Sequence, residues 1–247
     1  MLDNLVRIST LTLQLLSNQP NLPSEQVQYR EKPIYAAQVD GKTPIEKLLS
    51  EGEKYLDDRK FDKAIASYNA LMQLSPKGQA RIKTLHGLCK AYFEKAENIQ
   101  FDAPVDSTGY YTKVVTNCNK LLELPSDLSI KRDALLYSAM AYWYGLSEKH
   151  KNPKEAEKRL DDALSYSRQG NMKDDVMEFI MFQLGRVPFE NAEFDDRFKI
   201  DSSESAFKSL IEEFPNGNFF TDAKERLSKI PEIRAIIEAN KKYKKTK

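Results

Sequence analysis

The sequence predicts an all-α protein, and three observations support this prediction. From about Thr43 to residue 230 apolar residues recur with the period of a helix, and the alternating pattern of strands is scarce. Only 9 of the 247 residues are glycine, and these fall mainly between the helical segments. Thr43 is followed by Pro44, which is the combination of a capping residue and a first-turn proline that begins a helix.

The composition is that of a folded chain without a strong overall charge. Hydrophobic residues make up 40%, and 38 Lys and Arg residues balance 37 Asp and Glu residues to a net charge of +1. Binding to nucleic acid through overall charge is therefore not expected. No apolar run approaches the roughly 18 residues that span a bilayer, and no signal peptide is recognised. We expect a cytoplasmic protein, or a periplasmic one if a signal sequence has been removed.

Three regions follow from the distribution of prolines and charges. Residues 1–44 are predicted to form a short N-terminal helix over 1–17 and an extended, proline-containing arm over 18–44. Residues 45–230 form the helical region. Residues 231–247 hold the end of a C-terminal helix and a basic tail, "NKKYKKTK", which is the part of the chain best suited to touch an anionic membrane.

The first helical unit, "LLSEGEKYLDDRKFDKAIASYNALMQLSP", has small and aromatic residues in fixed positions. Gly52 and Ala64 are small where two antiparallel helices would cross, and Tyr55 and Tyr68 fill the wider gaps beside them. The segment "DDRKF" makes the turn between the helices, and Pro76 stops the second one.

This unit, over residues 45–78, resembles the tetratricopeptide repeat, a helix-turn-helix of roughly 34 residues. Looser matches follow in "TLHGLCKAYFEKA", in "ALLYSAMAYWYGL" with "EAEKRLDDALSYS", and in "VMEFIMFQLG" with "SESAFKSLIEEFPNG". The resemblance implies an α-solenoid of about four irregular repeats, closed by the helix "FFTDAKERLSKI". Long insertions are expected at 97–109 and 186–202, where the pattern is interrupted.

No catalytic or cofactor motif is recognised, so we predict no enzyme activity, no metal, no cofactor and no small-molecule substrate. Cys89 and His86 lie one helical turn apart, which leaves a cysteine nucleophile as an alternative. Cys89 takes the small-residue slot of its repeat, however, and together with Cys118 it is interpreted as a buried free thiol. Paired acids at 57–58, 161–162, 174–175 and 195–196 are interpreted as solvated groups near helix starts and turns.

The resemblance implies that the first helices of the repeats line a concave groove for a peptide or helix of a partner protein. The predicted partner-binding residues are those on the first helices that packing does not consume. They are Glu53, Lys83, His86, Lys90, Phe93, Tyr137, Met140, Trp143 and Tyr144, with Leu49, Leu56 and Leu136 beside them. The alternative for the aromatic residues is that they pack on the insertions or on the N-terminal arm.

Function is thus predicted to be that of a protein-binding adaptor or scaffold. A second family resemblance gives an alternative: "AFKSLIEEFPNGNFFTDAKERL" is similar to the repeats of bacterial envelope proteins such as the outer-membrane assembly lipoproteins. It implies a periplasmic assembly component. The segment 174–204, with nine acids against three bases, is either a docking site for a basic partner or a solvated face.

Overall fold

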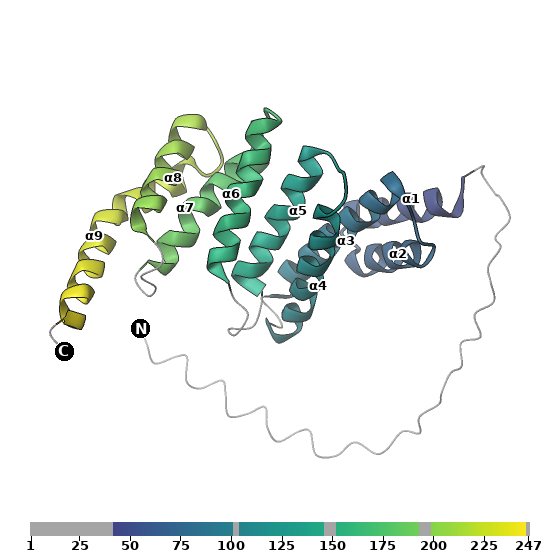
Figure 1. Cartoon of the computed structure of the whole chain (residues 1–247), viewed down its shortest axis with the longest axis horizontal. Helices are drawn as coiled ribbons and strands as arrows, with labels where there is room; N and C mark the ends of the chain where they lie inside the picture. The colour runs from purple at the N-terminus through teal and green to yellow at the C-terminus, as the bar shows by residue number, and fades with distance from the viewer. Residues whose placement is uncertain (1–41, 101–103, 146–151, 193–198, 246–247) are drawn as a thin grey trace, which may run out of the picture. The chain divides into compact units, whose positions relative to one another are not determined.

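The computed structural model describes residues 42–100, 104–145, 152–192 and 199–245 (Figure 1). Over these residues the chain is helical and contains no strand, which confirms the all-α prediction. The helices are α1 (Pro44–Asp57), α2 (Phe61–Gln73), α3 (Gly78–Gln100), α4 (Pro104–Leu122), α5 (Leu128–Met140), α6 (Pro153–Gln169), α7 (Asp175–Asn191), α8 (Ile200–Glu213) and α9 (Phe220–Lys245), and a π-helical turn, η1 (Ala141–Gly145), follows α5.

All of these elements belong to one compact unit, Gln38–Lys247. The helix predicted at 1–17 and most of the arm predicted at 18–44 lie outside the described residues. None of the described helices combines the length and apolar content needed to cross a membrane.

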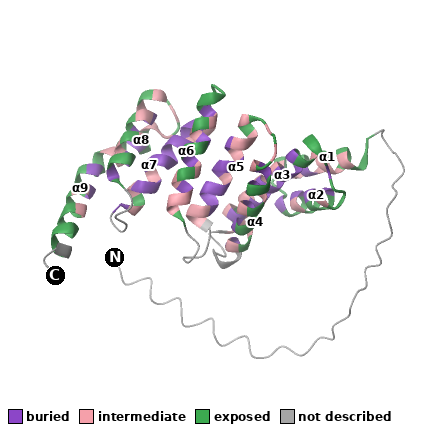
Figure 2. Ribbon diagram, viewed as in Figure 1, coloured by how far each residue is buried: buried purple, intermediate pink, exposed green. Residues whose placement is uncertain are grey.

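Each helix packs mainly on the helices that precede and follow it in the chain, as Figure 1 shows. Alternate helices also meet, because α1 touches α3 and α3 touches α5. The buried apolar side chains form two clusters, one over α1 to α5 and the other from α5 to α9. Figure 2 shows how the buried residues run along the sides of the helices that face these neighbours.

The first helix begins and packs as the sequence predicts. Thr43 and Glu46 form a reciprocal capping box, and Pro44 opens the first turn of α1. The ring of Tyr68, from α2, lies directly over Gly52 on α1, where an added Cβ would come within 2.7 Å of it. The same ring also lies over Gly87 on α3. Tyr68 therefore packs on top of the small residue rather than beside it, and it joins three helices.

The same pairing of a glycine with an aromatic ring recurs near the other end of the chain. Gly185 on α7 lies under the ring of Phe207 from α8, and a Cβ at Gly185 would come within 2.5 Å of ring atom Cδ1. Phe207 is fully buried, as Tyr68 almost is. A helix can approach a buried ring this closely only where it lacks a side chain.

The described residues of the two expected insertions are mostly helical. Residues 97–109 lengthen α3 to Gln100 and let α4 begin at Pro104. Within 186–202, α7 continues through Pro188 to Asn191 and α8 begins at Ile200. Extra helical turns thus interrupt the repeat pattern at these two places, as a loop would.

Helix α9 is also longer than the predicted closing segment. It extends for 26 residues, through Pro231, and it includes the lysines 241, 242, 244 and 245 of the predicted basic tail. Its buried residues, Ala223, Ile230 and Ile233, all come before residue 234. The acid pair 161–162 was also misplaced, because it lies in the middle of α6 and not near a helix start or turn.

Candidate functional site

The helical period places three predicted binding residues on one face of α3. Lys83, His86 and Lys90 are three and four residues apart, so their side chains follow one another along the helix. Glu53 on α1 faces the same space. These four residues line one open cleft of about 300 Å³ between α1 and α3.

The remaining residues that line this cleft come from four helices. Leu56 and Asp57 extend the α1 wall, Gln79 and Gly87 belong to α3, Tyr68 from α2 forms the base, and Ile130 comes from α5. Of these, only Leu56 was expected. Asp57 was identifiable from its position four residues after Glu53, whereas Ile130 enters through a contact that no local pattern reveals.

The two walls of the cleft carry opposite charge. Glu53 and Asp57 lie on the α1 side, and Lys83 and Lys90 lie on the α3 side. None of the four makes an ion pair within the described part of the chain. Burial, with the nearby carboxylates of Glu53 and Asp57, raises the pKa of Tyr68, so the base of the cleft is an uncharged phenol.

His86 connects the cleft to α5. Its Nε2 lies 3.4 Å from Oδ2 of Asp133, but the two groups are not aligned for a hydrogen bond, and Nε2 is buried without a hydrogen-bond partner among the described residues. Its ring centroid lies 6.4 Å from that of Tyr137. His86 is thus a wall residue that keeps one buried nitrogen unsatisfied.

Cys89 is fully buried, and its thiol interacts with that of Cys118 on α4. Burial, followed by this contact, raises the pKa of the Cys89 thiol well above its ordinary value. A nucleophilic cysteine needs the opposite, an exposed thiol with a lowered pKa. Both cysteines are free and buried, as predicted.

The predicted aromatic residues nearest to the cleft belong largely to the core. Phe93 and Tyr137 are partly buried and pack on each other with centroids 5.3 Å apart. Burial raises the pKa of Tyr137, and Met140 is only 2% exposed. The assignment of Met140 to the partner-binding groove is therefore corrected, because its side chain faces the core and offers almost no surface to a partner.

Trp143 and Tyr144 lie on the π-helical turn and pack against α7. The guanidinium of Arg186 stacks on both rings, 5.5 Å from the centroid of Trp143 and 5.6 Å from that of Tyr144. Arg186 also donates a hydrogen bond of 2.5 Å to the Tyr144 hydroxyl, and it pairs with Glu190. The aromatic excess is thus used within the chain, by an arginine from the segment expected to be an insertion.

The acidic segment 174–204 does not form a free acidic surface over its described residues. Asp174 caps α7 through the Met177 amide and accepts a hydrogen bond of 2.7 Å from Arg132. Burial opposes ionisation of Asp174, but these hydrogen bonds lower its pKa below the usual value. Asp201 and Glu204 pair with Arg234 on α9.

No group of three or more potential metal ligands occurs in the described ranges. No protein-family model matches the sequence, and a comparison with curated proteins gives no match. The candidate site is consequently characterised by its own geometry: an open cleft with separated, unpaired charges around a small apolar patch.

Proposed function

We propose that this protein is a non-enzymatic adaptor, built as an α-solenoid of about four tetratricopeptide-like repeats, which holds a peptide or helix of a partner protein in the cleft of α1 and α3. The repeated glycine and ring pairs, Gly52 with Tyr68 and Gly185 with Phe207, support the repeat interpretation. The contacts of α1 with α3, and of α3 with α5, support a surface lined by first helices.

One observation carries the binding proposal: Lys83 and Lys90 line the cleft without an ion-pair partner. Charges that do not pair contribute little to folding, and here they stand around two apolar side chains, Leu56 and Ile130. A segment that presents a carboxylate to the lysines and an aliphatic side chain to the apolar patch would satisfy both features.

The test is affinity capture from the source cells with the full-length protein as bait, followed by quantitative mass spectrometry. The variant is the double charge reversal Lys83→Glu with Lys90→Glu. The control is Lys47→Glu with Lys77→Glu, which makes the same change in net charge at two exposed lysines outside the cleft.

We expect at least one protein to be captured by the wild type and the control and to be lost from the cleft variant. Direct titration of that protein should then show a loss of affinity of roughly 2 kcal/mol or more, since the variant places like charges in the interface. If the cleft variant and the control retain the same proteins, binding does not use this cleft. Trp143→Ala is unsuitable here, because it removes the stacking of Arg186.

A further inference from the structure

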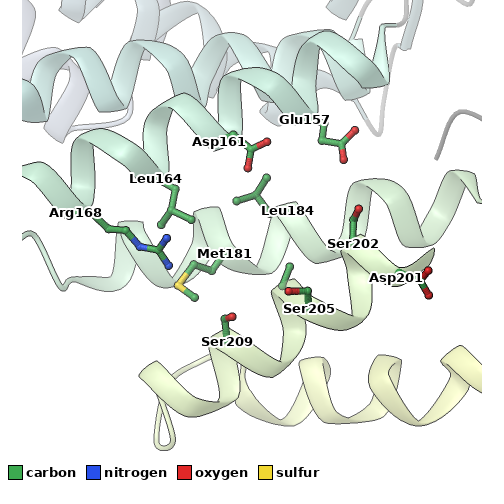
Figure 3. A pocket seen from close by; sticks show the side chains of 11 residues that line it. Glu157, Asp161, Leu164, Arg168, Met181, Leu184, Asp201, Ser202, Ser205 and Ser209 are labelled. Carbon is green, nitrogen blue, oxygen red and sulfur yellow. The ribbon is translucent and has the colours of Figure 1, made fainter. Parts of the chain in front are cut away.

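A second cleft, separate from the proposed adaptor site, lies between α6, α7 and α8 and has a volume of about 510 Å³. Figure 3 shows Asp161 and Leu164 on the α6 wall, Ser205 and Ser209 on the α8 wall, and Met181 and Leu184 of α7 between them. Nothing in the adaptor proposal uses these side chains.

The acidic end of this cleft contains one carboxylate without a cationic partner. Glu157 pairs with Lys154 at 2.9 Å, and Asp201 pairs with Arg234 at 2.7 Å. Asp161, one turn after Glu157 on α6, has no cationic partner among the described residues, although its position in the middle of α6 holds it over the cleft.

The arginine at the opposite end of the cleft already has an ion-pair partner. Arg168 lies there, away from Glu157 and Asp201 in Figure 3, and its guanidinium is already paired with Glu213 at 3.0 Å. The unbalanced charge of the cleft is therefore that of Asp161, and it is negative.

The floor and the α8 wall suit a peptide. Leu164 and Ala206 are partly exposed above the buried Met181 and Leu184, so the floor is apolar. The serines 202, 205 and 209 line the α8 wall and offer hydroxyls that can bond to a peptide backbone. From residue 202 to residue 209 the helix rises about 10 Å, which is the length of roughly three extended residues.

We propose that this cleft binds a short basic segment of a partner protein, with the head of one Arg or Lys side chain at Asp161 and its aliphatic stem on Leu164 and Leu184. Long cationic side chains bury their stems along apolar surface while their charged heads stay at a polar edge. Three extended residues match the length of the row of serines, and a positive charge on the segment complements Asp161, the cleft carboxylate without a cationic partner among the described residues.

The titration of Asp161 agrees with this geometry. Surrounding protein, and then the neighbouring acids Glu157 and Asp162, raise the pKa of the Asp161 carboxyl. A raised pKa in the folded chain means that the ionised carboxylate opposes folding as the pH rises through that range. Asp161 is exposed at the edge of the cleft, so water screens most of this penalty, and the side chain is accessible to a cation.

The probe is a bead-displayed library of random hexapeptides, selected for binding to the purified full-length protein. Peptides recovered with the wild type should be enriched in Arg or Lys next to an aliphatic residue. The best of these peptides is then labelled with fluorescein, and its affinity is measured by fluorescence anisotropy for the wild type and two variants, Asp161→Asn and Asp162→Asn.

Asp162 is the matched control, because it is the next residue on α6 and carries the same charge but lines another cleft, with Leu135 and Tyr166. Asp161→Asn should weaken binding about tenfold or more, and Asp162→Asn by less than about twofold. Replacing the basic side chain of the peptide by citrulline should cause the same loss, and Asp161→Asn should then add nothing further.

Thermal unfolding separates lost binding from lost folding. Asp161→Asn should unfold at the wild-type temperature or above it, since no ion pair is removed. The proposal is wrong if the library shows no enrichment of basic residues, if the two Asp variants weaken binding equally, or if spermidine at the same charge concentration displaces the peptide completely. Binding that is lost in Lys83→Glu with Lys90→Glu but kept in Asp161→Asn would also reject it.

Discussion

The substitution Gly52→Ala should destabilise the folded chain, although replacing glycine by alanine stabilises most helices. The Tyr68 ring lies between two glycines, Gly52 on α1 and Gly87 on α3, and a Cβ at Gly52 would stand 2.7 Å from ring atom Cε1 and 2.8 Å from Cζ. The ring cannot move away, because on its other side a Cβ position at Gly87 is only 2.6 Å from Cε2.

The magnitude follows from two opposing terms. Overpacking a rigid core site costs about 3 kcal/mol at the upper end of the usual range. Replacing glycine by alanine inside a helix stabilises by about 1 kcal/mol. Gly52→Ala should therefore lower the free energy of unfolding by about 2 kcal/mol, and Gly87→Ala by at least as much.

Urea unfolding followed by far-ultraviolet circular dichroism measures both variants. Gly109→Ala is the matched control, because Gly109 lies inside α4 with no atom within 4 Å of its Cβ position, and this change should stabilise by about 1 kcal/mol. In a Tyr68→Ala background the sign for Gly52→Ala should reverse. If Gly52→Ala stabilises the wild type as Gly109→Ala does, the ring is not clamped and the packing argument fails.

Three further predictions concern charge and burial. Although burial opposes it, hydrogen bonding lowers the pKa of Asp174 in the folded chain, so its stabilisation is complete above its unfolded pKa and is lost as the pH falls through the folded value. The deficit of Asp174→Asn in unfolding free energy at pH 7 should thus shrink toward about pH 2. Glu178→Ala leaves the Phe219 amide, which donates to the carboxylate at 2.7 Å, without its acceptor, at a cost of about 1–3 kcal/mol. Amide hydrogen exchange should accelerate in the first turn of α9, and unchanged exchange there would contradict this role. Cys89 and Cys118 should resist a disulfide reagent in the native protein and react only in denaturant, and a fast native reaction would restore the nucleophile hypothesis.

The helical class and the boundaries of the first pair of helices could be predicted because they depend on local signals. The capping box at Thr43 and the turn at residues 58–60 are read from neighbouring residues alone. The secondary structure of the insertions at 97–109 and 186–202 could not be predicted, because a lengthened helix and a loop interrupt a repeat in the same way. Their true state depends on what the extra turns contact, as Phe189 does when it packs against Phe207.

The same difference between local signals and distant contacts applies to the candidate site. Lys83, His86 and Lys90 share a helical face, and so their grouping was predictable from spacing. The contacts of Trp143 could not be predicted from spacing, because they depend on Arg186, which lies 43 positions later and on another helix. A large side chain in the sequence predicts a contact. It does not indicate whether the contacting residue belongs to the same chain or to a partner protein.

Whether a charged side chain is paired within the chain distinguishes a contact that serves folding from one offered to a partner protein better than residue type does. Some carboxylates that looked free in the sequence, such as Asp174 and Asp201, are paired with arginines from distant helices. The charges in the two clefts, on Lys83, Lys90 and Asp161, have no such partner among the described residues. The first cleft has unpaired charges of both signs, whereas the second has the unpaired carboxylate of Asp161. The two clefts are lined by different helices, so one partner need not exclude the other. An adaptor requires this independence, and the variants proposed for each cleft test it directly, because each should abolish one interaction and preserve the other.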